Sequence, residues 1–453
     1  MSRDTRRIRE GLATLAMAVA LTLSAGQAKA AGITTLASFS GPNGAEPYAG
    51  LTDVGGTLYG ATESGGTGGD GTLFSWSASN GLSTLVSFNG GGPVARLTDV
   101  GGTLYGTAGG GLGYGTIFSY SPGNGLQTLA NFDYTNGSSP RSALIDVNGT
   151  LYGTTGAGGS GANSDGTLFS WSPNGGGLTT LASFDYYSNG VNPFAGLTDV
   201  GGTLYGTTSG GGAGGGDGTL FSYASGTLTT LVNFDNTNGG GPEGRLVAVN
   251  GVLYGTTYYG GAAGHGTLFS WSASSGFQTL VNFDYPIGAY PVGGLLDVGG
   301  TLYGTTYYGG ANSDGTLFSW SANDGLQTVV AFDGANGGEP EGGLLAVNGT
   351  LYGTTYGGGA DAQGTLFSWS SSNGLQTLAS FDGTNGSGPR SALTDVGGTL
   401  YGTTYGGGAN NIGTIFSYTP AGQSVPEPGS LPLLLAGLGG LGALYLRRRL
   451  HLS

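Results

Sequence analysis

The segment Gly-Thr-Leu-Tyr-Gly at residues 300–304 recurs eight times along this chain, once with valine in place of threonine, and it decides the fold. The copies are spaced 46, 47, 53, 49, 49, 49 and 49 residues apart, counted at Tyr59, Tyr105, Tyr152, Tyr205, Tyr254, Tyr303, Tyr352 and Tyr401. A repeat of this length, dense in Thr, Leu, Phe, Tyr and Gly, holds one small antiparallel sheet that buries its faces only against its neighbours. The period therefore predicts a single repeat array, although the length alone suggests roughly three ordinary domains.

Each repeat contains four predicted strands, best seen in the sixth copy. Residues 293–298 and 301–306 meet across Gly299-Gly300, and the two glycines predict a tight type I′ hairpin because both can adopt positive φ. A polar long loop at 307–315 leads to the third strand at 316–321, and a turn leads to the fourth at 326–332. A return loop then leads to the next copy, where a proline precedes the first strand. Proline has no backbone N–H, and at this position the sheet needs no hydrogen bond from it. These prolines are Pro47, Pro93, Pro140, Pro193, Pro242, Pro291, Pro340 and Pro389.

The phase of the repeats predicts a closed ring. A lone fourth strand at 33–39 precedes the first copy, whereas the last copy has three strands, at 392–396, 399–404 and 413–418. The N-terminal strand can complete the last blade and remove both sheet edges. We therefore predict an all-β fold, an eight-bladed β-propeller of four-stranded blades over residues 31–421, with repeats of about 49 residues. A β-solenoid is the alternative, and it would need capping repeats.

The composition excludes several classes of function. Residues 31–421 hold four arginines against 23 aspartates and glutamates, which gives a net charge of −19. Such a surface repels polyanions, so we predict no nucleic-acid partner. The chain has no cysteine, which excludes disulfides and thiolate metal sites.

The N-terminal residues 1–30 read as a secretory signal helix. Four arginines, at positions 3, 6, 7 and 9, precede the apolar run at 12–23, and Ala28 and Ala30 offer small residues at a cleavage site. We predict export through the Sec route and cleavage after this segment. A retained membrane helix is the alternative, and the short apolar run argues against it.

The C-terminal tail resembles the PEP-CTERM sorting signal of Gram-negative bacteria. A linker at 422–430 contains Val425, Pro426, Glu427 and Pro428; an apolar segment at 431–446 and a basic tail at 447–453 with Arg447, Arg448 and Arg449 follow it. We predict that the apolar segment forms a hydrophobic helix with its arginines on the cytoplasmic side, as the positive-inside rule requires. The resemblance implies transient insertion in the inner membrane, processing by an exosortase-type enzyme, and release or attachment at the cell surface. A plain membrane anchor is the alternative.

The repeats themselves resemble the GloVer tandem repeat of bacterial surface proteins, those with a choice of C-terminal anchor. The resemblance rests on Leu-Tyr-Gly, the Gly-rich long loop, Gly-Thr-Leu-Phe and the Thr-Leu-x-x-Phe-Asp strand, and it covers residues 33–420. It implies an extracellular propeller-like protein and carries no established catalytic residues.

Tyrosines gather in one sector of the predicted ring. Since strands alternate in direction, the long loops and return loops share one face. The last four long loops and the return loop before the sixth copy hold Tyr258, Tyr259, Tyr307, Tyr308, Tyr356, Tyr405, Tyr285 and Tyr290. Rings on a polar surface suit stacking on sugar faces, so we hypothesise a glycan-binding sector. The alternative is that these rings fill the packing between loops.

The sequence supports metal and catalytic sites less well than it supports a glycan-binding sector. Aspartates recur two residues before the hairpin glycines, as in Asp53 and Asp297, and could hold Ca²⁺, but such residues commonly accept local backbone hydrogen bonds. We predict no cofactor and no metal, with Ca²⁺ as the open alternative. His265 occupies a long-loop position where other copies have Asp or Gln, which indicates a turn residue.

These observations predict a secreted cell-surface or extracellular-matrix repeat protein that is processed by an exosortase. We expect a non-catalytic structural or adhesive propeller, not an enzyme, with exopolysaccharide as a partner. Two alternatives remain open: a hydrolase or lyase that acts on polysaccharides through carboxylates of the long-loop face, and a cation-binding matrix protein.

Overall fold

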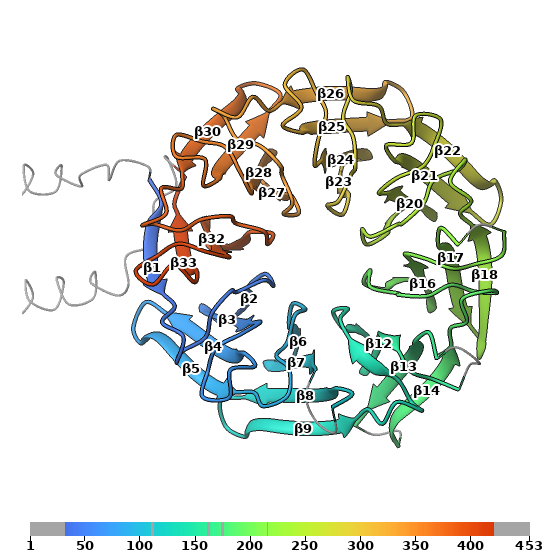
Figure 1. The fold of residues 1–453 in the computed structure, drawn as a ribbon, viewed down its shortest axis with the longest axis horizontal. Coiled ribbons are helices and arrows are strands. Elements are labelled where there is room, and N and C mark those ends of the chain that lie inside the picture. The colour runs from blue at the N-terminus through green and yellow to red at the C-terminus, as the bar shows by residue number, and fades with distance from the viewer. Residues whose placement is uncertain (1–31, 110–112, 161–163, 174–175, 215, 421–453) are drawn as a thin grey trace, which may run out of the picture. The chain divides into compact units, whose positions relative to one another are not determined.

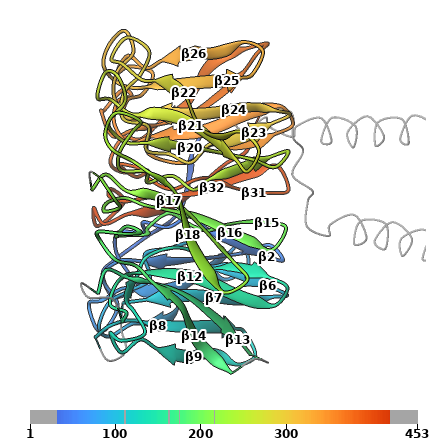
Figure 2. The same cartoon turned by 90° about the vertical axis from the view of Figure 1, so that its right-hand side faces the viewer.

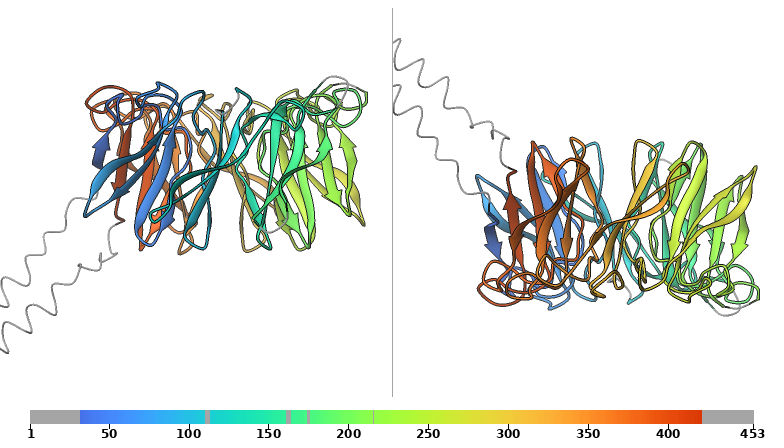
Figure 3. Two further views of the ribbon diagram at one scale, coloured as in Figure 1. Left: turned by 90° about the horizontal axis from the view of Figure 1, so that it is seen from below. Right: turned by 90° about the horizontal axis from the view of Figure 1, so that it is seen from above.

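The repeats form a closed β-propeller. The computed structural model describes residues 32–109, 113–160, 164–173, 176–214 and 216–420. The compact unit that holds the repeats runs over Lys29–Val396 and Leu400–Tyr418. Its strands form eight antiparallel sheets around a central axis (Figure 1), which confirms the predicted eight-bladed architecture. In side view the strands run from one face of the ring to the other (Figure 2 and Figure 3).

The predicted terminal helices are not among the elements that the structure describes. The signal segment at 1–30 and the hydrophobic segment at 431–446 lie outside the described residues. Within the described ranges, no helix combines the length and the apolar character needed to cross a membrane.

The inner strand of each blade has three residues and lies nearest the centre of the ring (Figure 1). In the sixth blade it begins three residues later than predicted, because Gly293 and Gly294 face neighbouring blades; a Cβ on Gly293 would lie 3.7 Å from the Gly342 carbonyl oxygen. The inner strands are β2 (Thr52–Val54), β6 (Thr98–Val100), β11 (Ile145–Val147), β15 (Thr198–Val200), β19 (Val247–Val249), β23 (Leu296–Val298), β27 (Leu345–Val347) and β31 (Thr394–Val396).

The second and third strands form the middle of each blade. The second strands are β3 (Thr57–Thr62), β7 (Thr103–Ala108), β12 (Thr150–Ala157), β16 (Thr203–Thr208), β20 (Val252–Thr257), β24 (Thr301–Thr306), β28 (Thr350–Thr355) and β32 (Thr399–Thr404). The third strands are β4 (Thr72–Ser77), β8 (Thr116–Ser121), β13 (Thr167–Ser172), β17 (Thr219–Ala224), β21 (Thr267–Ser272), β25 (Thr316–Ser321), β29 (Thr365–Ser370) and β33 (Thr414–Tyr418).

The outer strands lie on the perimeter of the ring (Figure 1). They are β5 (Gly81–Ser87), β9 (Gly125–Asn131), β14 (Gly177–Ser183), β18 (Thr227–Asn233), β22 (Gly276–Asn282), β26 (Gly325–Ala331), β30 (Gly374–Ser380) and β1 (Thr34–Ser38). The third blade differs from the prediction, because a short strand β10 (Ser138–Pro140) pairs with the extended end of β12 and makes its sheet five-stranded. In other blades the same loop contact is a single bridge, such as Val191 with Gly210.

In every blade, a phenylalanine ring of the third strand packs over a glycine of the second strand and forms the core. In the sixth blade Gly304 of β24 pairs with Phe318 of β25, and a Cβ on Gly304 would lie 2.5 Å from the end of the Phe318 ring. Phe318 is fully buried. The Leu-Tyr-Gly motif therefore requires its glycine, because the ring occupies the space that any side chain would need.

Aromatic contacts join each blade to the next. The phenylalanine after each outer strand packs on the core ring of the following blade, as in Phe283 with Phe318, whose ring centroids are 5.1 Å apart. Tyr303 of the Leu-Tyr-Gly motif packs on Trp369 of the next blade at 5.7 Å. The repeated tyrosine and tryptophan therefore hold neighbouring blades together, as expected of a fold that buries its sheets only against copies of itself.

The N-terminal strand closes the ring, as the phase of the repeats predicted. β1 pairs antiparallel with β33 and supplies the outer strand of the eighth blade. Phe39 packs on Phe74 of the first blade at 5.1 Å, and Tyr401 packs on Trp76 at 5.8 Å. The contacts between the eighth and first blades thus repeat those between the other blades, so no sheet of the ring is left without a neighbour.

We expect Gly304→Ala to lower the free energy of unfolding by about 1–3 kcal/mol, because its Cβ would overlap the Phe318 ring. The matched control is Gly123→Ala, in a turn with no atom within 4 Å of the added Cβ. That control should change stability by less than about 1 kcal/mol. Urea denaturation of both variants measures the difference, and equal midpoints would refute the role of the glycine.

Candidate functional site

The long loops and return loops lie on one face, as predicted, and are paired to each other. In the sixth repeat Ala289 of the return loop bridges Tyr308 of the long loop. The base of the long loop is held by Thr306, whose hydroxyl donates to the Tyr308 carbonyl (2.9 Å) and lies 2.8 Å from the Thr316 hydroxyl. Both threonines are fully buried. The backbone of this face is therefore rigidly placed, and its side chains can differ between repeats.

Five tyrosines and a histidine form one connected cluster, which we call the aromatic sector: Tyr258, His265, Tyr285, Tyr290, Tyr307 and Tyr308. Tyr290 lies at its centre, with its ring centroid 5.2 Å from Tyr258 and 6.2 Å from Tyr308. Tyr307 and Tyr308 pack edge to face at 4.5 Å. The structure thus brings together five of the eight tyrosines in the hypothesis.

His265 belongs to this cluster through ring contacts and one hydrogen bond. Its ring lies 4.6 Å from Tyr285, and its Nδ1 lies 3.1 Å from the Tyr290 hydroxyl. At the matching position of the third repeat, Asp165 accepts a hydrogen bond from the backbone N–H of Tyr186. His265 therefore replaces an acceptor of a backbone N–H with a packed aromatic ring, which a variable turn position permits.

Tyr290 has a left-handed backbone, with φ of 58°. Non-glycine residues rarely adopt this conformation, which costs about 1–3 kcal/mol unless the surroundings impose it. Here Tyr290 N–H donates to the His265 carbonyl (2.8 Å), and its own carbonyl accepts from Tyr307 N–H (3.0 Å). These bonds hold the backbone of Tyr290 between the long loops of the fifth and sixth blades.

The three remaining tyrosines of the hypothesis lie outside the aromatic sector. The Tyr259 hydroxyl donates to Asp217 Oδ1 (3.1 Å). Tyr356 and Tyr405 lie against the Arg390 guanidinium, with 4.5 Å and 4.9 Å between its carbon and the ring centroids. All three are half-buried and serve packing between blades.

The eight tyrosines of the glycan-binding hypothesis also differ in their exposure to solvent. Tyr285 and Tyr308 are 43% and 37% exposed, whereas the other six are half-buried. Sequence reasoning missed the exposed rings on other blades: Tyr48, Tyr114, Tyr134, Tyr186, Tyr187 and Phe194. Tyr134 and Tyr186 directly follow the aspartate after an outer strand, and Tyr187 comes next; this position in the return loop was the available signal.

Burial and acidic neighbours alter the tyrosine pKa values on this face. Desolvation, and then the hydrogen bond to Asp217, raise the pKa of Tyr259 to about 12. Burial, with the charges of Glu339 and Glu341 beside it, raises the pKa of Tyr307 well above its usual value. These hydroxyls therefore stay protonated at neutral pH and act as hydrogen-bond donors.

The recurrent aspartates accept hydrogen bonds that stabilise turns. Asp53 and Asp297 each accept a hydrogen bond from the second glycine of the hairpin, at 3.0 and 2.9 Å. In the return loop Asp133 accepts from the Thr135 hydroxyl and the Asn136 N–H, and these bonds lower its pKa. Within the described ranges, no three acidic or histidine side chains are grouped so that they could hold a metal ion.

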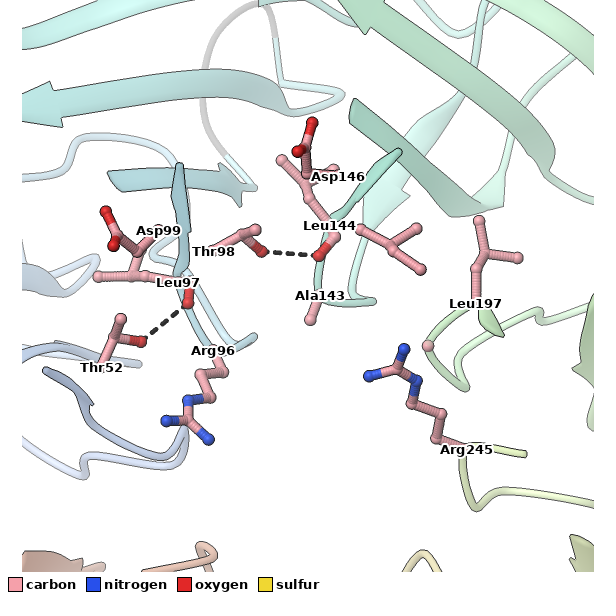
Figure 4. A pocket seen from close by; sticks show the side chains of 12 residues that line it. Thr52, Arg96, Leu97, Thr98, Asp99, Ala143, Leu144, Asp146, Leu197 and Arg245 are labelled. Carbon is pink, nitrogen blue, oxygen red and sulfur yellow. Dashed lines mark hydrogen bonds between the residues drawn. The ribbon is translucent and has the colours of Figure 1, made fainter. Parts of the chain in front are cut away.

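Residues that precede the inner strands, together with residues of the inner strands themselves, border cavities in the region that we call the channel. At the loop face a cavity of about 580 Å³ is bordered by Tyr48, Glu63, Arg141, Phe194 and Glu243, among others. A second cavity, of about 390 Å³, is lined by residues of the first five blades (Figure 4). The predicted signal-cleavage residues Ala28 and Ala30 and the sorting residues at 425–428 and 447–449 lie outside the described residues.

Comparisons with known proteins agree with this architecture. The model of the Gloeobacter/Verrucomicrobia repeat matches residues 17–221, 158–318 and 312–427, and that of the PEP-CTERM protein-sorting motif matches residues 424–449. The sequence matches none of the curated proteins with which it was compared.

Solved structures are similar to this chain to different degrees. BamB from Moraxella catarrhalis is similar over 87% of this chain and 99% of its own, with 12% identity and a TM-score of 0.52. A putative 6-phosphogluconolactonase from Bacteroides uniformis (72% and 95% covered, 14% identity, TM-score 0.46) and a streptogramin B lyase (71% and 93%, 15%, 0.45) also match. At these identities the likeness concerns the fold alone.

We expect Tyr259 to make stability sensitive to alkaline pH. Its pKa is raised from 10.0 to about 12 in the folded chain, so its contribution is complete below pH 10.0 and is lost as the pH rises through 12. Tyr259→Phe cannot ionise and should show a smaller fall in melting temperature between pH 10.0 and 12 than the wild type. Parallel melting curves of the two proteins over this range would contradict the assignment.

Proposed function

Because this chain belongs to the Gloeobacter/Verrucomicrobia repeat family and carries a PEP-CTERM protein-sorting motif, we propose that it is a non-catalytic structural or adhesive propeller. Both resemblances seen in the sequence are thereby confirmed. The sorting motif marks a secreted protein that is transiently anchored in the membrane and processed by an exosortase to the cell surface. Export through the Sec route, cleavage near Ala30 and retention in an extracellular matrix are parts of the proposal.

Glycan binding is the adhesive activity that we propose, and the exposure of Tyr285 and Tyr308 carries it. Their rings lie at the two edges of a packed cluster that fixes Tyr290 and His265 between them. A rigid, partly exposed aromatic surface can stack on sugar rings at little entropic cost, and the tyrosine hydroxyls can bond sugar hydroxyls. The ligand that we propose is an exopolysaccharide of the cell surface.

A polysaccharide-acting hydrolase or lyase is the second candidate. Desolvation raises the pKa of half-buried Glu341 and also that of Glu243, whose side chain is exposed; both precede inner strands at the loop face. A carboxyl group with a raised pKa suits a general acid, although structural groups show the same shift. Turnover of purified polysaccharide, lost in both Glu243→Gln and Glu341→Gln, would favour this candidate over an adhesive one.

Tyr285→Ala combined with Tyr308→Ala should weaken binding to purified exopolysaccharide at least fivefold, about 1 kcal/mol, because each ring offers a stacking surface. The matched control is Tyr134→Ala with Tyr187→Ala, two exposed tyrosines of other return loops. Affinity electrophoresis with immobilised polysaccharide measures the difference. An equal loss in both double variants, or no loss in either, would reject the aromatic sector as the binding surface.

Pro426→Ala combined with Glu427→Ala should keep the apolar segment at 431–446 attached to the chain, because the processing enzyme reads the preceding motif. We expect this variant to accumulate in the membrane fraction, as measured by immunoblot of fractionated cells. Pro420→Ala with Gln423→Ala, placed just before the motif, is the control and should be processed normally. Normal release of the first variant would show that the motif does not direct processing.

A further inference from the structure

The four arginines of the described residues all precede inner strands, at two levels of the channel. Arg141 and Arg390 directly follow the repeat proline, whereas Arg96 and Arg245 are the third residue after it. The other six blades have glycine or alanine at this third position: Gly50, Ala143, Gly196, Gly294, Gly343 and Ala392. Two long cationic side chains therefore extend into a layer of the channel that is otherwise lined by small residues.

The arginines at the first level have partners, whereas those at the second level do not. Arg390 Nε lies 3.5 Å from Glu341 Oε2, and its guanidinium packs on two tyrosine rings. Arg141 lies 5.7 Å from the centre of the Phe194 ring. In the described part of the chain, neither Arg96 nor Arg245 forms an ion pair or a hydrogen bond through its side chain.

Both unpaired arginines border the same cavity. Its volume is about 390 Å³, and Arg96 and Arg245 reach into it from opposite sides (Figure 4). Their stems pass close to glycines of the preceding blades: a Cβ on Gly50 would lie 3.8 Å from Arg96 Cδ, and one on Gly196 would lie 3.5 Å from Arg245 Cδ. Cavities of roughly 300–1,000 Å³ are typical of sites for small molecules.

Two aspartates line the cavity as well, but they do not neutralise the arginines. Asp99 Oδ1 accepts a hydrogen bond from Gly102 N–H in its hairpin. In Figure 4 the carboxylates of Asp99 and Asp146 point away from both guanidinium groups. The surrounding blades lower the pKa of Arg96 and of Arg245 by desolvation. Both side chains are nevertheless exposed, so two charges face the solvent of the cavity without a counter-ion, an arrangement that a bound anion would stabilise.

We propose that Arg96 and Arg245 form an anion-binding site in the channel for a small ligand that bears a carboxylate or sulfate group. Guanidinium groups bind both kinds of oxyanion through paired N–H donors. The ligand is small because the ring as a whole carries a net charge of −19 over residues 31–421, which repels a long polyanion. An acidic monosaccharide fits this description. The inference does not rest on glycan binding by the aromatic sector.

The test uses the purified full chain and three probes: inorganic sulfate, glucuronate and neutral glucose. Isothermal titration calorimetry should detect sulfate and glucuronate but not glucose, with an affinity that falls as chloride is added. Arg96→Gln combined with Arg245→Gln should weaken binding at least tenfold. The melting temperature of this variant without ligand should not fall, because both side chains are exposed and have no ionic partner among the described residues, so a folded protein is available for the comparison.

Arg141→Gln is the matched control, since it removes an arginine of the first level and should bind sulfate and glucuronate like the wild type. Arg245→Lys, which keeps the charge but not the paired donors, should have intermediate affinity. Binding of sulfate alone, lost in the double variant, supports an oxyanion site without sugar recognition. Three results would overturn the proposal: no heat with either anion at millimolar concentration, unchanged binding in the double variant, or an equal loss in Arg141→Gln.

Discussion

The packing of a phenylalanine ring on a glycine in the neighbouring strand is the contact on which the rest of this ring depends. In the sixth blade the Phe318 ring takes the space where a side chain on Gly304 would lie. The same ring receives Phe283 from the preceding blade. Tyr303, one residue before the glycine, points to the opposite face of the sheet and packs on Trp369 of the following blade. The Leu-Tyr-Gly motif and the phenylalanine that packs on it therefore form the core of a blade and its contacts with the preceding and following blades.

The side chains of the loop face vary between blades, although backbone hydrogen bonds between neighbouring loops recur around the ring. In six of the eight repeats the residue before the repeat proline donates its N–H to the long loop of the preceding blade, as Tyr290 does to His265 and Glu339 does to Asp314, each at 2.8 Å. The buried threonine pairs at the base of the long loops add side-chain bonds below this level. Above them, aromatic rings, acids and arginines occupy equivalent positions in different blades. Any binding specificity of this protein arises from these differences between copies.

Much of the fold was predictable from particular residues, and much of the site was not. The lone strand ending at Phe39 and the incomplete unit around Tyr401 predicted closure, because backbone pairing needs only complementary strands. The tyrosines of the long loops were placed correctly on one face, but their exposure was not predictable: Tyr259 turns to Asp217, whereas Tyr308, its neighbour in the next blade, stays exposed. The difference arises from contacts between loops far apart in the chain, which a repeat pattern does not encode.

The sequence by itself determined the number of blades, their strand order and the closure of the ring, because these follow from a local period and from the hydrogen-bonding needs of strand edges. It also determined the family and the sorting motif, which are carried by short contiguous segments. Only the tertiary structure decided which side chains meet. Arg96 and Arg245 are separated by three repeats in the chain, yet the curvature of the ring brings both to one cavity. That curvature is the sum of packing contacts between all eight blades, and no single repeat contains it.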